Sequence, residues 1–337
     1  MPSLQLPRPC KPLRAALLHS LAAALALLAA ACAGPPERPS ARPPLAYAAA
    51  GDGLFARHAP VFVPQYTERE YNRIGSAAAR VTEDGGEEIY IDTARPVFYV
   101  QRREFETARG RYTNLVYRVH FTEIPFSLAP FHLTAGRNVG LIVVVTLDER
   151  GRALLITTVH ACGCYLGMIP TSNLDPAAYP PGWNTGERDA FGETLPGRVD
   201  YPETPEGVHP VIRLRHGTHR VMDVALSRLE AVARDARIRR TELVPMEALE
   251  RIPLDGRTTG FYRESGILAG HVKGTFKPLE LLFMSWWVLD PGVGVDKKYG
   301  PREETGTVFY TSLKPWNRSR SDMWRFPAFL EFWGWNL

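Results

Sequence analysis

The sequence has few cysteines and no marked excess of charge of either sign. Its 337 residues include four cysteines, 40 basic residues and 36 acidic residues. A chain this close to neutrality lacks the basic surface that nucleic acids require, and we exclude them as partners. Walker phosphate loops, Gly-x-Ser-x-Gly motifs, Gly-x-Gly-x-x-Gly fingerprints and Cys-x-x-Cys-His haem sites are absent as well. Functions that depend on these motifs therefore have no support.

The N-terminus carries the pattern of a secretory signal. Three basic residues, Arg8, Lys11 and Arg14, precede an apolar run from Leu21 to Ala31. A basic region followed by a short apolar run and small residues is typical of a cleaved signal, not of a membrane-spanning helix. The signal holds three basic residues and no acidic one, so 37 basic and 36 acidic residues remain after its removal.

The apolar run ends in Leu28-Ala29-Ala30-Ala31-Cys32, which resembles the lipobox of bacterial lipoproteins, with Ala29 where Leu is usual. The resemblance implies cleavage before Cys32, attachment of fatty acids such as palmitate to that cysteine, and a membrane partner reached through this lipid anchor. By the sorting rule of the class, Ala33 implies the outer membrane of a bacterial envelope, facing the periplasm. Several acyl chains make such an anchor stable. The alternative is an ordinary cleaved signal with an incidental cysteine.

Three regions follow from this interpretation. Residues 1–31 form the signal peptide, residues 32–53 form the lipidated cysteine and a tether rich in Pro and Ala, and residues 54–337 form a single body. Six of the seven tryptophans lie beyond residue 258. We expect this aromatic C-terminal segment to be core or to pack onto the rest of the body, since large aromatics dominate burial. The sequence identifies no protein partner.

Apolar and β-branched segments predict a sheet. Strands are expected at residues 88–92, 97–106 and 112–123, and a hairpin joins Val139–Leu147 to Arg152–His160. Because both faces of that hairpin are apolar, we expect it in the middle of the sheet, covered on both sides. The predicted fold class is α+β, with a central antiparallel sheet of hairpins, a few helices and long Pro-rich loops.

The second half of the chain predicts a further hairpin and a helix. Residues 211–216 and 219–224 flank Gly217-Thr218, which fits a two-residue turn. His216 and His219 would then be opposed at an exposed tip, where neighbouring arginines disfavour a cation. Residues 226–240 have helical spacing, and residues 167–210 are irregular and Pro-rich.

The most distinctive stretch is His160-Ala161-Cys162-Gly163-Cys164, at the end of the central hairpin. On a strand the His160, Cys162 and Cys164 side chains leave the same face, with adjacent members about 6.8 Å apart. Gly163 permits a bend that would bring them together. After maturation these are the two cysteines left unmodified, in an oxidising compartment.

Three interpretations of this stretch remain open. Two thiolates and an imidazole form most of a zinc or copper site, with His120 on the preceding strand as the first choice of outside ligand. A Cys162–Cys164 disulfide would instead close a small, strained and readily reduced ring. The third interpretation is two cysteines that simply pack in the interior.

The leading prediction is therefore an envelope lipoprotein that binds zinc or copper through His160, Cys162 and Cys164. A thiol–disulfide redox protein that uses the Cys-Gly-Cys pair is the alternative from another class. A structural or assembly lipoprotein without chemistry is the third. The sequence assigns no catalytic residue and does not decide between enzyme and binding protein.

Overall fold

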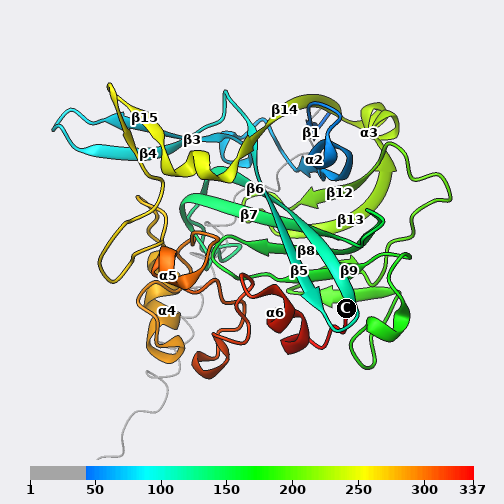
Figure 1. The fold of residues 1–337 in the computed structure, drawn as a ribbon. Coiled ribbons are helices and arrows are strands. Elements are labelled where there is room, and N and C mark those ends of the chain that lie inside the picture. The colour runs from blue at the N-terminus through cyan, green and yellow to red at the C-terminus, as the bar shows by residue number, and fades with distance from the viewer. Residues whose placement is uncertain (1–42) are drawn as a thin grey trace, which may run out of the picture. The chain divides into compact units, whose positions relative to one another are not determined.

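A computed structural model describes residues 43–337 (Figure 1). The predicted signal peptide, the predicted lipidation site Cys32 and most of the predicted tether lie outside these residues. Contacts divide the described chain into two units. The small unit is the segment Ser127–His132, in which Leu128 and Phe131 form an isolated antiparallel bridge. The large unit holds the other described residues, and the fold and site below belong to it.

One large mixed sheet forms the body of the large unit (Figure 1). Its ten strands follow the order β13-β12-β2-β1-β14-β5-β6-β7-β8-β9. Their bounds are Leu45–Ala49 (β1), Val61–Pro64 (β2), Val97–Thr107 (β5), Gly110–Ile124 (β6), Gly136–Leu147 (β7), Ala153–His160 (β8), Gly167–Pro170 (β9), Val208–Leu214 (β12), Val221–Arg228 (β13) and Arg237–Pro245 (β14). Three two-stranded ladders of the described chain join Ser76–Val81 (β3) to Glu87–Asp92 (β4), Glu187–Ala190 (β10) to Glu193–Pro196 (β11), and Ile252–Leu254 (β15) to Arg257–Thr259 (β16).

The sheet is not built from antiparallel hairpins alone, which corrects the predicted topology. Strands β5 to β9 do form an antiparallel meander, and β7 and β8 pair as the predicted hairpin. The pairs β1–β14, β14–β5 and β2–β12 are parallel. The chain is mixed α and β but dominated by strands, so the α+β prediction holds in this coarser form.

Strand β14 joins the two halves of the sheet. Its first part, Arg237 to Thr241, pairs with β1, and its second part, Glu242 to Pro245, pairs with β5. The change of partner lets one strand hold together the antiparallel meander and the group β13-β12-β2-β1.

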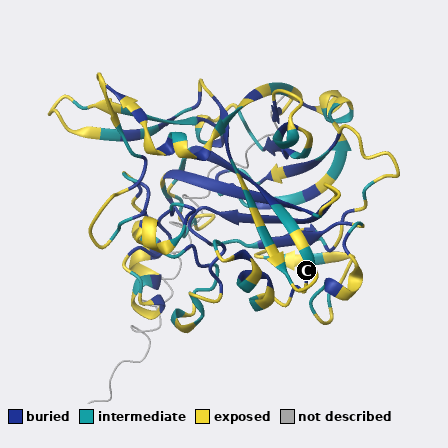
Figure 2. Ribbon diagram, in the orientation of Figure 1, coloured by how far each residue is buried: buried dark blue, intermediate teal, exposed yellow. Residues whose placement is uncertain are grey.

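Strands β7 and β8 are buried on both faces of the sheet, whereas parts of β5, β13 and β14 are exposed (Figure 2). Alternate residues of β7 face opposite cores because side chains alternate along a strand. Val143 and Val145 belong to one cluster together with Tyr117 and Phe62. Ile142 and Val144 belong to a second cluster, which includes C-terminal aromatics such as Phe309, Phe326 and Phe329. The all-apolar hairpin is therefore covered on both faces, as its sequence predicted, but it lies close to the β9 edge of the sheet and not in its middle.

The folded body begins earlier than residue 54. Strand β1 covers residues that the sequence assigned to the tether, and each of its five residues is buried. These residues resemble a tether because three of the five are alanines, which are common in linkers. Alanine also fits a crowded central strand.

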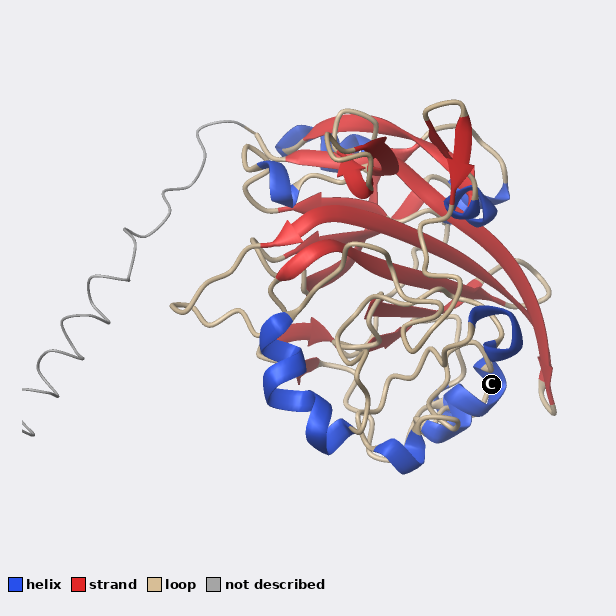
Figure 3. Ribbon diagram, turned by 90° about the vertical axis from the view of Figure 1, so that its left-hand side faces the viewer, coloured by secondary structure: helices blue, strands red, loops and turns tan. Residues whose placement is uncertain are grey.

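Short helices and turns complete the described body. They are Leu54–His58 (α2), Leu229–Asp235 (α3), Pro278–Val288 (α4), Arg302–Thr305 (α5) and Phe326–Phe332 (α6), with 3-10 turns at Glu70–Asn72 (η1), Pro176–Ala178 (η2), Met246–Glu250 (η3) and Pro315–Asn317 (η4). Figure 3 shows the strands above and several helices below, with loops between them.

Two expectations for the second half were wrong. The predicted helix over residues 226–240 is split between β13, the short α3 and β14, because parallel pairing with β1 overrides the helical spacing. The segment 167–210 is not wholly irregular, since it contains β9 and the β10–β11 hairpin. That hairpin contacts β13, and its residues line a small hollow together with β9, so it lies between the two edges of the curved sheet.

Candidate functional site

Residues 160–164 form a tight bend where β8 ends. The backbone N–H of His160 donates to Cys164 O at 2.9 Å, and that of Gly163 donates to His160 O at 2.7 Å. Gly163 has a φ of +97°, in the left-handed region that favours glycine. A Cβ at this position would lie 2.0 Å from the carbonyl oxygen of Tyr310. Glycine is therefore required here both for its conformation and for the space it leaves.

The bend places the two cysteines in contact as free thiols. Cys162 is buried and Cys164 is half-buried. A hydrogen bond from Cys164 lowers the pKa of the Cys162 thiol; burial opposes this effect, and the charge of Lys277 adds to it. The same hydrogen bond, together with burial and the charge of Cys162, raises the pKa of the Cys164 thiol. The pair therefore releases one proton more readily than an isolated thiol and holds the second more tightly.

Lys277 faces this pair of thiols. Its side chain is buried, and Nζ donates to Asp296 Oδ1 at 3.1 Å and lies 3.9 Å from Glu280 Oε2. Asp296 Oδ2 in turn accepts the backbone N–H of Gly140 at 2.6 Å. Burial disfavours the ammonium group, but the charges of Asp296, the two cysteines and Glu280 outweigh burial and raise the pKa of Lys277. The lysine therefore stays charged and stabilises a negative sulfur.

Lys297 binds the backbone of the bend directly. Nζ of this fully buried lysine donates to Cys162 O at 2.7 Å, and it lies 4.5 Å from the centroid of the Tyr310 ring. The Tyr310 hydroxyl donates to Asp290 Oδ2. The segment from Asp290 to Lys297 thus fixes the backbone that carries the cysteines.

The ring of His160 is held by residues of the β12–β13 connection and the bend. Its Nε2 lies 3.2 Å from the carbonyl oxygen of His219, and its ring packs edge-on against Tyr165 at 4.8 Å between centroids. Burial, and then the charge of Lys277, lower the pKa of His160 to about 4. His160 is therefore neutral at physiological pH and acts as a buried packing and hydrogen-bonding group in this arrangement.

His120, the predicted outside ligand, lies in a different environment. It is fully buried on β6, where Arg118 Nε donates to its Nε2 at 3.0 Å. Its ring packs against Phe261 and Tyr99. Burial and the Arg118 charge hold the pKa of His120 well below its usual range. A donor already bound at Nε2 and a neighbouring guanidinium leave His120 poorly suited to ligate a cation.

His216 and His219 do not form the exposed hairpin tip that the sequence predicted. His219 is buried and stacks on Phe121, with ring centroids 4.0 Å apart, and His216 Nδ1 lies 2.8 Å from Asn72 Nδ2. The prediction was wrong because the connection is longer than two residues and folds back onto the body: Arg215 and Arg220 close it by a backbone hydrogen bond.

The structure brings Cys162 and Cys164 together, with His160 beside them and His120 elsewhere. Within residues 43–337, no three His, Cys, Asp or Glu side chains are grouped as they would be around a metal ion. Nor does this part of the chain contain a helix of the length and apolarity needed to cross a bilayer. Comparisons of the chain with protein-family models, curated proteins and solved structures find no match. The chemistry of the site must therefore be argued from its own geometry.

Sequence reasoning missed the charged residues of this site. Lys277, Glu280 and Asp296 lie more than 110 residues after the cysteines, and none belongs to a recognisable motif. The available signal was Lys277 itself, a lone cation beside an apolar helix. A lysine in such a setting is rarely buried without a partner, so it pointed to a nearby carboxylate.

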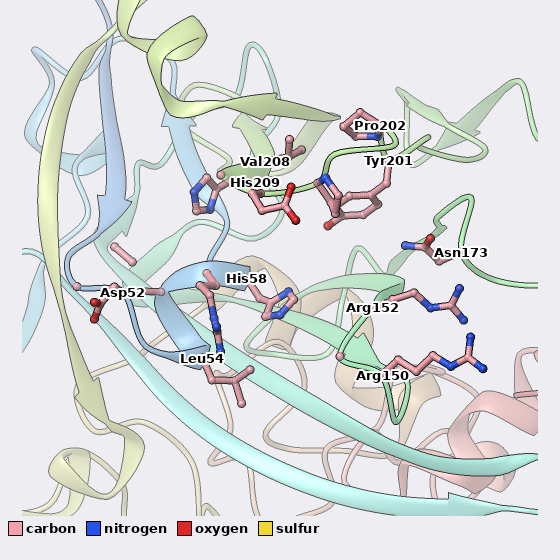
Figure 4. A pocket seen from close by; sticks show the side chains of 18 of the residues that line it. Asp52, Leu54, His58, Arg150, Arg152, Asn173, Tyr201, Pro202, Val208 and His209 are labelled. Atoms are coloured by element: carbon pink, nitrogen blue, oxygen red, sulfur yellow. The ribbon is translucent and has the colours of Figure 1, made fainter.

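A hollow of the described chain lies away from the thiols, which do not line it. Its volume is about 820 Å³, and Figure 4 shows Asp52, His58, Arg150, Tyr201 and His209 around it. Arginines and carboxylates both line this hollow, and Arg152 is paired with Asp148. Mixed and partly neutralised charge defines no ligand class, so the thiol pair remains the candidate site.

Stability should fall as the medium becomes acidic. Burial first, and then a neighbouring lysine, lower the pKa of His160 and of His271 from 6.5 to about 4. Between these values the unfolded chain takes up protons that the folded chain refuses, so stability is complete above about pH 6.5 and is lost towards pH 4. Each histidine contributes about 1.4 kcal/mol per pH unit over that window.

Urea unfolding at several pH values checks this expectation. The amide of His271→Asn can still donate to Ala269 O as His271 Nδ1 does. In this variant the free energy of unfolding should change less with pH, by the amount that one histidine contributes. An unchanged slope in this variant would mean that His271 does not contribute to the acid sensitivity.

Proposed function

We propose that this protein is a thiol–disulfide redox protein in which Cys162 and Cys164 alternate between two thiols and a disulfide. The observation that carries the proposal is the placement of two free thiols at a glycine bend beside the buried Lys277. A low-pKa sulfur in contact with a second sulfur is what disulfide exchange requires.

The reaction would run in two steps with an outside protein or peptide disulfide. Cys164 is the half-buried residue of the pair, so its sulfur is the one that an outside substrate can reach. It becomes the attacking thiolate when the single proton that the pair retains moves to Cys162. The Cys164 thiolate attacks one substrate sulfur, forms a mixed disulfide and expels the other substrate sulfur, which takes up a proton. Cys162 then loses its proton and attacks Cys164, and the first substrate sulfur leaves and is protonated. The substrate gains two electrons and two protons. The protein supplies both electrons and the one proton left on the pair, and the second proton comes from the solvent that took it up when the pair first ionised.

A zinc or copper site at Cys162 and Cys164 is the second candidate. The observation in its favour is that Glu280 Oε2 is buried near the thiols without a hydrogen-bond partner in the described chain. Glu280 or His160 would then complete the site. Two buried ammonium groups, of Lys277 and Lys297, oppose a cation at the same place, and this is why the redox proposal is preferred.

The envelope location is part of the same proposal. The lipobox-like segment ending at Cys32 supports a lipid-anchored protein facing an oxidising compartment, where exchangeable disulfides form. A location of this kind would give the thiol pair disulfide substrates.

One sample distinguishes the three interpretations of the cysteines. The protein is purified from membranes without chelators, its metals are measured by elemental mass spectrometry, and its thiols are titrated after denaturation with a chelator present. We expect no stoichiometric metal, and a form lacking two hydrogens in which neither Cys162 nor Cys164 reacts. Glutathione should reduce that form, because the ring is small and strained. Cys162→Ser and Cys164→Ser should each abolish it.

The other outcomes contradict the redox proposal. One zinc or copper per chain, lost in Cys162→Ser, would establish the metal site instead. Two thiols that stay reduced in the presence of oxidised glutathione, without metal, would make the cysteines structural, as in an assembly protein without chemistry.

A further inference from the structure

Helix α4 exposes a stripe of large apolar side chains. Leu282, Trp286 and Leu289 are 66, 72 and 67 % exposed, and their spacing of four and three residues places them on one side of the helix or just after its end. Leu281 and Trp287 flank the stripe and are also exposed. Figure 2 shows much of this helix in the exposed colour. A helix of a soluble domain normally turns polar residues to water.

The opposite side of α4 is already used by the fold. Glu280, Met284 and Val288 are its buried residues, at a spacing of four. Met284 and Val288 form a small apolar cluster with Val293, and Leu133 and Leu313 pack against it. The apolar stripe therefore cannot turn inward without unpacking this cluster and the Lys277–Glu280 pair.

A second exposed tryptophan lies close to the end of α4. Arg318 Nη2 donates to Val288 O, so the segment around η4 lies next to the C-terminal end of the helix. Trp316 in that segment is 76 % exposed. We call the residues Leu282, Trp286, Leu289 and Trp316 the α4 surface.

The exposed charges beside Trp316 are basic, and Asp290, which follows Leu289, is half-buried and accepts the Tyr310 hydroxyl. Lys314 and Arg320 are exposed on either side of Trp316, and no acidic residue occurs from 281 to 289 or from 312 to 321. Exposed leucines supply apolar area, tryptophans prefer the boundary between hydrocarbon and water, and basic residues attract anionic headgroups. This combination fits a lipid surface better than a protein partner, whose contacts bring acidic and basic residues together.

We propose that the α4 surface inserts into the interface of a bilayer that contains anionic lipids. The helix would lie in the plane of the membrane, with its buried face holding the body. The predicted acyl anchor at Cys32 lies eleven residues before the first described residue, so it would keep the body within about 40 Å of the bilayer. This proposal does not depend on the redox chemistry. It does rest on the proposed lipid anchor, which holds the α4 surface near the bilayer.

Quenching by brominated lipids tests the insertion. The lipidated full chain is reconstituted in vesicles of phosphatidylcholine and phosphatidylglycerol, with acyl chains either plain or brominated near the headgroup. Three of the seven tryptophans, Trp286, Trp287 and Trp316, belong to or flank the α4 surface. We expect bromination to lower the emission by roughly a third, because an interfacial helix lies within quenching range of the upper acyl chain.

Two variants make the test specific. Leu282→Ser combined with Leu289→Ser changes only exposed side chains, so the fold should persist while quenching falls by about half or more. The control is Val81→Ser, an exposed apolar residue of β3, which should quench as the unaltered protein does. Thiol titration in the same samples confirms that the site at Cys162 is intact.

Three results would overturn the proposal. One is emission that bromination leaves unchanged in the unaltered protein. Another is quenching that the double Ser variant retains in full. The third is a cross-linked dimer that the double variant loses, with no quenching in either protein, which would assign the α4 surface to a second copy of the chain.

Discussion

Lys277→Met should lower the free energy of unfolding by about 3–5 kcal/mol, the usual cost of leaving one partner of a buried ion pair without the other. Asp296 and Lys277 are both buried, and Nζ lies 3.1 Å from Oδ1. The same substitution should raise the pKa of Cys162, because the lysine charge helps to hold it down. Urea unfolding measures the first effect, and the pH dependence of alkylation by iodoacetamide measures the second.

A double variant separates the two effects. Adding Asp296→Asn to Lys277→Met removes the stranded carboxylate and keeps an oxygen that can accept the Gly140 N–H. Most of the lost stability should return. The alkylation profile should move only part of the way back, because the Asp296 charge raises the pKa of Cys162 by less than the Lys277 charge lowers it. If the profile were unshifted in Lys277→Met alone, Lys277 would not be the charge that acts on the thiols.

Gly163→Ala should be among the most damaging single-methyl additions in this chain, with a loss of about 4 kcal/mol or more. The added Cβ would lie 2.0 Å from Tyr310 O, and the residue would keep a φ of +97°. A backbone oxygen cannot move aside as a flexible side chain can. The bend must therefore open, which separates the sulfurs, and we expect the oxidised form with a Cys162–Cys164 bond to disappear from the mass spectrum.

Gly151→Ala is the matched control for this variant. Gly151 lies in the turn between β7 and β8, with a φ of +77° and nothing within 4 Å of an added Cβ. Its substitution should cost only about 1–2 kcal/mol, the strain of a left-handed alanine, and should leave the disulfide intact. Similar losses in both variants would mean that conformation, and not the approach of Tyr310, decides the need for glycine at position 163.

The sequence predicted the parts of the fold that depend on neighbouring residues. The hairpin of β7 and β8 follows from two apolar, β-branched runs, with Asp148 and Gly151 in the turn between them. The pairing of β1 with β14 could not be read in this way, because Leu45 lies opposite Arg237 and nothing local in either segment identifies the other. The alanines of β1 also resemble those of a linker.

The sequence predicted the bend of the candidate site but not its charged residues. Cys162, Gly163 and Cys164 are adjacent, so their bend and contact followed from the glycine. The charges that set the pKa values of the thiols come from Lys277 and its partner Asp296. Their approach depends on how the C-terminal segment covers the sheet, which no local pattern specifies.

The shared strand β14 has a consequence for the order in which the chain can fold. Its two halves pair with segments that begin about 190 and 145 residues earlier, so the ladders on either side of it are long-range, as the β2–β12 ladder also is. Loop-closure entropy makes such ladders slow to form. During synthesis the meander from β5 to β9 can assemble alone, while β1 waits with one edge open until residue 245 has emerged. An open edge is a template for wrong pairing. Misfolding should therefore be decided at β14, well before the aromatic C-terminus is complete.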